Sequence, residues 1–413
     1  MFIIGRAVAG IGSSGIQNGG FTIVAACAPL EKRPVLMGIL IGICQIGLVG
    51  GPTIGGALTQ YTTWRWCFYI NLPVGAVTIA TILLVAIPDR RKQPDMKAET
   101  FAFSKLDLPG FALFAPFAIM VLLALEYGGN QYAWNSATVI GLFVGGFVLL
   151  IIFVLWEIRE GNQAMIPMPV LRKRQIWSSC VASFFLFGSM LGAGYFLPVY
   201  FQSVKGMTPV GSGVAMLPAI VSQLAAGVVA GFLMQRVGYY LPFMIIGGVI
   251  TTIGNGLITT FDVYTTTLKW AGFQVLLGLG RGMLFQAPIL AVQSHADESL
   301  LPLAMATLVF FQTFGGAVFL SIANSIFNNK LKEELVARVP QLNADKIIHA
   351  GARGIHDVVP MQYLIEVLKS YSSGVNNVFY AVTAFAGAMF VLSWGMGMKD
   401  IRKKKKPVKK GEA

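Results

Sequence analysis

Long apolar stretches separated by short polar connections run through almost the whole chain of 413 residues. A helix needs about 20 apolar residues to cross the hydrocarbon core of a bilayer. The pattern therefore predicts an all-α integral membrane protein with about eleven transmembrane helices. These fall at residues 2–28, 35–59, 66–87, 108–127, 136–158, 176–202, 210–235, 241–262, 268–292, 302–327 and 375–398.

The composition also indicates a membrane protein. Hydrophobic residues make up 55% of the chain and charged residues only 12%, whereas a soluble domain carries about 25% charged residues. The alternative, a large soluble protein with many buried helices, is excluded because one soluble fold cannot bury so many all-apolar helices at once.

The net charge of +13 would also suit a nucleic-acid partner, but the positions of the basic residues indicate a membrane instead. Lysine and arginine gather in alternate connections and in the tail around 402–406, and the short connections between them hold few. This is the positive-inside pattern, which predicts a cytoplasmic C-terminus. With an odd number of spans, the N-terminus is expected on the opposite side. We therefore expect the bilayer, and no nucleic acid, as a partner.

Glycine is patterned in the second predicted span. Gly47, Gly51 and Gly55 recur every four residues on one helix face, with Pro52 and Gly56 beside them. Small residues at that spacing let two helix backbones approach closely, and proline permits a kink. Tight packing alone, or a packed pivot between two moving halves of a bundle, would each explain this pattern.

Two arginines lie within predicted spans. Arg6 shares a stripe with Gly10 and Gln17 in the first span, and Arg281 stands near the middle of the ninth. A charged side chain at lipid depth costs a few kcal/mol, about 3 or more, and such residues usually face a wet cavity. Arg6 is close enough to the chain start to reach the membrane surface instead. The sequence places no aspartate or glutamate deep in any predicted span, so a membrane carboxylate for proton relay is not visible.

Five segments in order resemble motifs of the major facilitator superfamily, and most closely its fourteen-helix drug:proton antiporters of the fungal branch that exports toxins and other secondary metabolites. These segments are Arg6–Gly12, Gly47–Gly56, Trp64–Pro73, Phe196–Gly206 and Gly278–Pro288. The resemblance covers nearly all of residues 1–400.

The resemblance has departures. Ala9 stands where many family members have glutamine in the arginine motif. Segment 231–238 is only a partial echo of the family's loop motif, because Gln235 replaces the usual acid and Tyr239 and Tyr240 replace the basic pair. The family's first-helix acidic motif is missing. The chain therefore resembles a member that lacks its first three helices.

The family fold implies two six-helix lobes with two extra central helices. On that basis residues 1–88 would form the second half of the N-terminal lobe, and residues 89–175 the two extra helices with basic linkers. Residues 176–398 would form the C-terminal six-helix lobe, with an extracellular loop at 328–374 that caps the outer mouth, and 399–413 a basic cytoplasmic tail.

The resemblance implies a secondary active transporter that exports amphipathic organic compounds by proton antiport and alternating access. Its partners would be a small organic substrate, protons and lipid, with no cofactor besides the proton gradient and no metal. We expect a monomer in the plasma membrane, or in the vacuolar membrane. Expected transport and gating residues are Arg6, Gly10, Gly47, Gly51, Pro52, Gly55, Gly56 and Arg281. Expected substrate-binding residues are Gln17, Gln45, Tyr195, Asn255, Gln286, Phe311 and Gln312.

Three other interpretations remain open from the sequence. The chain could be an inactive or incomplete fragment of such a carrier, or act only as a partner of another chain. It could be a metabolite facilitator without proton coupling. A membrane enzyme would need acids or histidines clustered near a span end for metal or acid–base chemistry; we find no such cluster and expect no catalytic activity.

Overall fold

The computed structural model describes residues 2–29, 31–63, 65–84, 107–129, 131–161, 164–166, 168–297 and 300–402. Within these ranges the regular structure is helical, apart from a single bridge between Gly128 and Tyr132. Helices stand at all eleven predicted positions, and nine helical segments of the described chain are long and apolar enough to cross a membrane. The predicted all-α, multi-pass membrane architecture is confirmed, and the number of spans remains approximate.

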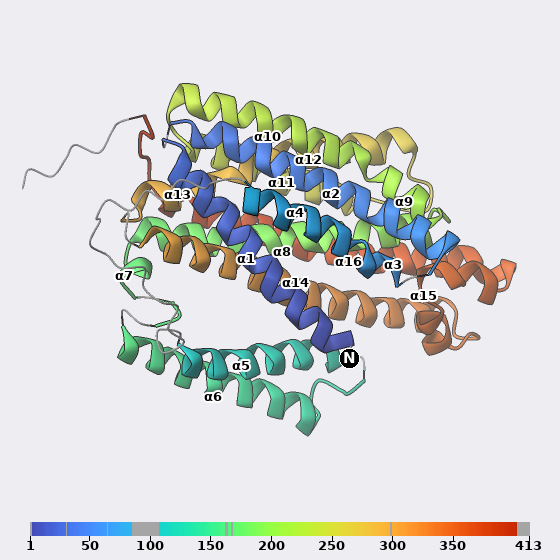
Figure 1. Cartoon of the computed structure of the whole chain (residues 1–413). Coiled ribbons are helices and arrows are strands. Elements are labelled where there is room, and N and C mark those ends of the chain that lie inside the picture. The colour runs from blue at the N-terminus through green and yellow to red at the C-terminus, as the bar shows by residue number, and fades with distance from the viewer. Residues whose placement is uncertain are drawn as a thin grey trace, which may run out of the picture.

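The helices follow one another along the chain as a bundle with a separate hairpin beside it (Figure 1). In order they are α1 (Phe2–Cys27), α2 (Arg33–Tyr61), α3 (Trp66–Tyr69), α4 (Asn71–Leu84), α5 (Leu108–Tyr127), α6 (Ala137–Glu160), α7 (Met168–Leu171), α8 (Arg174–Ser203), α9 (Pro209–Ala215), α10 (Leu217–Val237), α11 (Leu241–Ile258), α12 (Thr267–Leu284), α13 (Gln286–His295), α14 (Leu301–Arg338), α15 (Ala344–Val358), α16 (Met361–Ser393) and the short 3₁₀ helix η2 (Trp394–Met396).

Glycines let the helices of the α8–α16 bundle approach one another closely. A methyl group added at Gly280 would lie 2.7 Å from the backbone nitrogen of Thr251, and one added at Gly254 would lie 3.0 Å from the Cα of Leu277. Both approaches join α11 to α12. Because dispersion attraction falls off steeply with separation, this contact between backbones gives the pair its cohesion in an apolar solvent.

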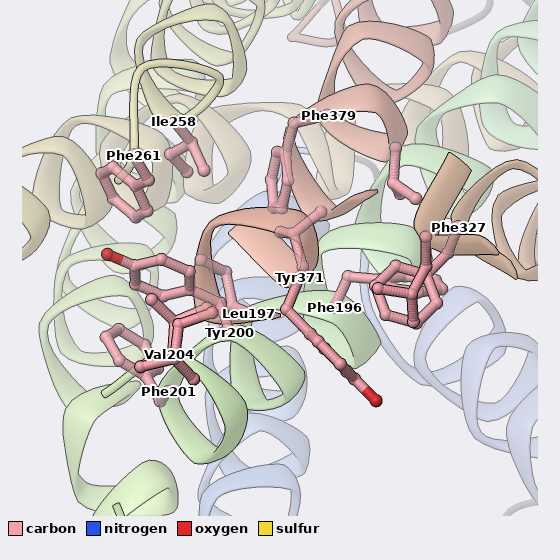
Figure 2. Close-up of a cluster of buried hydrophobic side chains, with 14 of the residues drawn as sticks. Phe196, Leu197, Tyr200, Phe201, Val204, Ile258, Phe261, Phe327, Tyr371 and Phe379 are labelled. Atoms are coloured by element: carbon pink, nitrogen blue, oxygen red, sulfur yellow. The ribbon is translucent and has the colours of Figure 1, made fainter. Parts of the chain in front are cut away.

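Aromatic side chains fill one end of this bundle (Figure 2). Phe196 and Tyr200 of α8 lie there with Phe261, which follows α11, and with Phe379 of α16, all of them buried. The Tyr200 hydroxyl donates to the carbonyl of Asp262 at 2.7 Å, so the one polar atom of this ring is satisfied within the apolar cluster.

The α5–α6 hairpin lies along α14 (Figure 1). Phe114 of α5 packs against Phe310 and Phe314 of α14, with ring centroids 4.9 and 5.3 Å apart. Toward the other end of α5, the amide of Asn324 donates to the Glu126 carboxylate at 3.1 Å. Among the described residues, these contacts attach the hairpin to the bundle through α14.

The segment 328–374, expected as an extracellular loop, is mostly helical in its described residues. Helix α14 continues to Arg338 because Glu334 pairs with Lys330 and Arg338, at 3.3 and 2.6 Å, on successive turns. Arg338 also reaches Glu366 of α16 at 3.4 Å. The charges end the apolar stretch without ending the helix, and Leu331 and Leu335 stay buried beneath them.

Basic side chains cap helix ends at the side predicted to face the cytoplasm. Lys173 Nζ lies 2.6 Å from Asp297 and donates to the carbonyl of His295 at 3.3 Å, at the end of α13. Arg402 donates to the carbonyl of Arg236 at 2.9 Å, at the end of α10. Cations are favoured at helix C-termini, where carbonyls lack helical partners. Some of the basic residues that make up the charge pattern, such as Lys173 and Arg402, therefore stabilise helix C-termini.

Candidate functional site

A cavity of about 480 Å³ lies between α1, α2 and the junction of α12 with α13. It is mostly apolar with a few polar groups, and its volume falls in the range of roughly 300–1,000 Å³ typical of small-molecule sites. The lining residues are Ser13, Ile16, Gln17, Gly20, Phe21, Leu40, Cys44 and Phe285.

The break between α12 and α13 places Phe285 in the cavity wall. Helix α12 ends at Leu284 and α13 begins at Gln286. Pro288 has no amide hydrogen to donate to the carbonyl four residues earlier, which is that of Leu284, so the helix is interrupted there. The Phe285 ring packs at 5.2 Å against Phe187 of α8 and closes this part of the wall.

Next to the cavity, α2, α10 and α13 meet at a joint of small residues. The side-chain nitrogen of Gln286 donates to the carbonyl of Gly227 at 2.7 Å. A methyl group at Gly38 would lie 3.0 Å from that nitrogen, and one at Gly231 would lie 2.9 Å from the carbonyl oxygen of Pro34. Gln286 therefore bonds across the joint; it does not line the cavity.

The expected packing of the Gly47, Gly51 and Gly55 face is not what the structure shows. Gly47 and Gly51 are exposed, and a methyl group at either would meet nothing within 4 Å. Gly55 approaches only the sulfur of Cys67, at 3.8 Å. Helix α2 instead packs through Gly38, nine residues before Gly47 and therefore about 180° around the helix from it. The side chains of Gln45 and Pro52, and Gly56, lie outside the described residues.

In α1, Gln17 lies in the cavity wall as expected, one turn from Ser13. Arg6 and Gly10 belong to the exposed part of the same helix and are not among the cavity-lining residues. Arg6, Gly10 and Gln17 share one face in the sequence pattern, but of these three only Gln17 lines the cavity.

Arg281 and Asn255 are brought together inside the α8–α13 part of the bundle. Arg281 is 7% exposed and donates from Nη2 to the carbonyl of Ser189 at 3.2 Å. Asn255 donates from its side-chain nitrogen to the hydroxyl of the same Ser189, also at 3.2 Å. The two expected functional residues thus share one partner on α8.

The remaining expected substrate residues lie apart from the cavity lining. Gln312 is buried on α14, and Phe311 is half-buried and packs against an apolar cluster that includes Phe21 of α1. Tyr195 is 54% exposed and contacts the ring of Phe196. Of the expected substrate-binding residues whose side chains the structure describes, only Gln17 lines the cavity.

Sequence reasoning missed Ser13, Leu40, Cys44 and Phe285. Ser13 had a usable signal, because it lies one helical turn from Gln17 on the same face. Phe285 had one as well, since it stands three residues before a proline at which a helix is expected to break. Leu40 and Cys44 are ordinary apolar positions, and only the packing of α2 against its neighbours identifies their face.

Within the described part of the chain, no group of three or more histidine, cysteine, aspartate or glutamate side chains could hold a metal ion. The described cavity lining consists of apolar walls with the amide of Gln17 and the hydroxyl of Ser13. Such a surface accommodates an amphipathic organic molecule.

The chain is similar in sequence to known proteins of one family. The sequence pattern described as Major Facilitator Superfamily matches residues 1–320. The MFS-type transporter pigP of Monascus ruber is 50% identical over 413 residues, which cover all of this chain and 72% of that protein. The MFS-type transporter calB of Penicillium decumbens is 48% identical, over 98% of this chain and 73% of its own length. The efflux pump mlcE of Penicillium citrinum is 46% identical, over 98% of this chain and 75% of its own length.

Proposed function

The chain belongs to the major facilitator superfamily, and we propose that it is a secondary transporter that exports amphipathic organic compounds such as secondary metabolites. The observation that carries this proposal is the cavity between α1, α2 and Phe285, which is apolar apart from a few polar groups. The direction of transport is supported by similarity to two proteins named efflux pumps, from Penicillium citrinum and Monascus pilosus.

Alternating access would use the joint at Gly38, Gly227 and Gln286. This joint connects α2, which contributes to one wall of the cavity, with α10 and with α13, which begins directly after the lining residue Phe285. Two groups of helices that touch through small residues can rock against one another while keeping a site between them. The pivot is therefore proposed at Gly38, where the sequence had suggested Gly51.

We further propose a fourteen-helix arrangement of which this chain supplies the helices from the fourth onward. The exposed apolar faces support it: the described residues of α4 include no buried side chain, and Val8 and Ile16 of α1 are 63% and 74% exposed. The first relatives compared are also longer, since the chain covers about three quarters of each. Further helices on this face would enclose the cavity.

Proton antiport is proposed from the family resemblance, with a cytoplasmic tail and a plasma-membrane location. A second candidate, a facilitator without proton coupling, is favoured by one observation: none of the described residues that line the cavity is acidic. The two differ in their dependence on the external proton concentration.

Efflux from yeast that lacks its own drug exporters tests both. Cells expressing the chain are loaded with a panel of amphipathic fluorescent dyes, and retention is followed at external pH 5 and pH 7. We expect faster loss than from cells with an empty vector, and faster loss at pH 5 than at pH 7. Equal loss at the two pH values would support the facilitator, and retention equal to the empty vector for every dye would contradict export.

A further inference from the structure

Arg281 is a buried cation within the bundle. Its side chain is 7% exposed, and Nη2 has one acceptor, the carbonyl of Ser189 at 3.2 Å. The Nε hydrogen is buried and has no acceptor. Among the residues that the structure describes, no carboxylate pairs with this guanidinium. A guanidinium that serves only to hold a fold is expected to satisfy most of its five donors.

The groups around Arg281 are polar and also incompletely bonded. Asn255 donates to the Ser189 hydroxyl at 3.2 Å, while its own side-chain oxygen is buried without a partner. The hydroxyl of Thr251 is buried and unbonded as well. Thr251 and Asn255 stand one turn apart on α11, which packs against α12. Donors from three helices, α8, α11 and α12, thus meet in one place that lacks an acceptor of matching charge.

This place is next to the cavity along α12. Arg281 and Phe285 are four residues apart, so they lie on the same side of the chain about one turn from each other. Phe285 lines the cavity and packs on Phe187, and Arg281 reaches Ser189, two residues further along α8. Arg281 is not itself among the lining residues, so a molecule in the cavity would reach the guanidinium only by moving the Phe285 ring.

We propose that Arg281 binds the anionic group of the transported compound, and that the carrier consequently selects organic acids, carboxylates above all. A carboxylate accepts two parallel hydrogen bonds from a guanidinium, here from Nε and an Nη, and the Thr251 hydroxyl is a further donor. The apolar part of the acid occupies the cavity against Phe285 and Phe21. This inference rests on the proposed export function and adds the class of substrate.

A matched pair of probes tests the charge requirement. 1-Pyrenebutyric acid and 1-pyrenebutyramide share the same apolar body and differ in the anionic group. Export of both is measured from cells expressing the wild-type chain, Arg281→Gln, Arg281→Lys and the control Arg236→Gln, in which the exposed cation of α10 is removed. The amount of each variant in the membrane is measured alongside.

We expect the wild-type chain to export the acid in preference to the amide. Arg281→Gln should lower acid export about ten- to hundredfold, the loss expected for a hydrogen-bonded charge pair, and leave amide export unchanged. Arg281→Lys should retain part of the preference for the acid, because it keeps the charge and loses the two-pronged geometry. Arg236→Gln should match the wild type.

Equal losses of acid and amide export in Arg281→Gln would show a structural role and overturn the inference. So would a wild-type chain that exports the amide, or other neutral dyes, as well as the acid; export itself would then stand. Failure to export any dye would instead contradict the proposed function. If Arg281→Gln does not reach the membrane, binding to the purified wild-type protein is the test. The acid should raise its thermal unfolding midpoint and the amide should not. A midpoint that the acid does not raise, or that the amide raises as much, overturns the proposal.

Discussion

The side-chain nitrogen of Gln286 donates a hydrogen bond to the backbone carbonyl of Gly227, 2.7 Å away. The bond joins the first residue of α13 to the middle of α10, and Gly38 of α2 lies directly against it. Gln286 is 0% exposed, so the carbonyl has no water to replace this donor. Three helices that meet beside the cavity therefore depend on one side chain.

Replacing Gln286 by methionine keeps most of the side-chain volume and removes the donor. The buried carbonyl of Gly227 would lose its bond to the side chain, which costs about 1–3 kcal/mol. We expect a lower thermal unfolding midpoint for the purified protein in detergent. Gln131→Met, at an exposed loop position, is the control and should unfold at the wild-type temperature; an unchanged midpoint for Gln286→Met would contradict the importance of this bond.

Two glycine-to-alanine changes distinguish where α2 packs. In Gly231→Ala the new methyl group would lie 2.9 Å from the carbonyl oxygen of Pro34, so α10 and α2 must separate, at a cost of about 1–3 kcal/mol. In Gly51→Ala the methyl group meets nothing within 4 Å, and the better helix former should leave stability equal or higher. The measurement is again thermal unfolding, together with dye export. Loss of stability and export in Gly51→Ala, with a wild-type Gly231→Ala, would restore the pivot to Gly51.

Asp107 gives the base of the α5–α6 hairpin a pH dependence. Burial raises the pKa of this carboxyl, but hydrogen bonds from the Trp156 indole and the backbone of Gly110 and Met165 lower it by more, so its pKa lies below the ordinary value of 3.8. A lowered pKa in the folded state stabilises the fold above the unfolded-state pKa. That stability is lost as the pH falls through the lower folded-state value.

We therefore expect Asp107→Asn to unfold at a lower temperature than the wild type at pH 6, by the equivalent of about 1 kcal/mol, because hydrogen bonds to a neutral amide are weaker than those to a carboxylate. The gap should narrow as the pH falls below about 4, because the wild-type carboxyl then becomes protonated. A gap that is constant from pH 6 to pH 3 would show that the charge of Asp107 does not contribute.

Much of the fold was predictable from the sequence, because membrane helices are recognised by length and apolarity alone. The helical structure within 328–374 was less easily predicted, because α14 continues to Arg338, beyond the end of its apolar stretch. Glu334 and Arg338 pair one turn apart on α14, and such oppositely charged pairs stabilise a helix beyond the end of its apolar stretch.

The candidate site was predictable only in part. Gln17 was found because a polar residue in an apolar span usually faces a cavity or another helix. The packing face of α2 was not found, because glycines repeat on two faces and nothing in one helix shows which face meets a neighbour. Gly38 and Gly47 differ only in what stands opposite them, and that is decided by α10 and α13.

The most direct test of the account fills the cavity. Gly20 lines it, and a methyl group there would be 4.0 Å from its nearest neighbour, the side chain of Leu40, so Gly20→Trp places an indole in the space proposed for substrate. Gly12→Trp on the exposed part of the same helix is the matched control. Export of 1-pyrenebutyric acid should be abolished in Gly20→Trp and retained in Gly12→Trp, at equal amounts of protein in the membrane. Export by Gly20→Trp at the wild-type rate would contradict the claim that this cavity carries the transported compound.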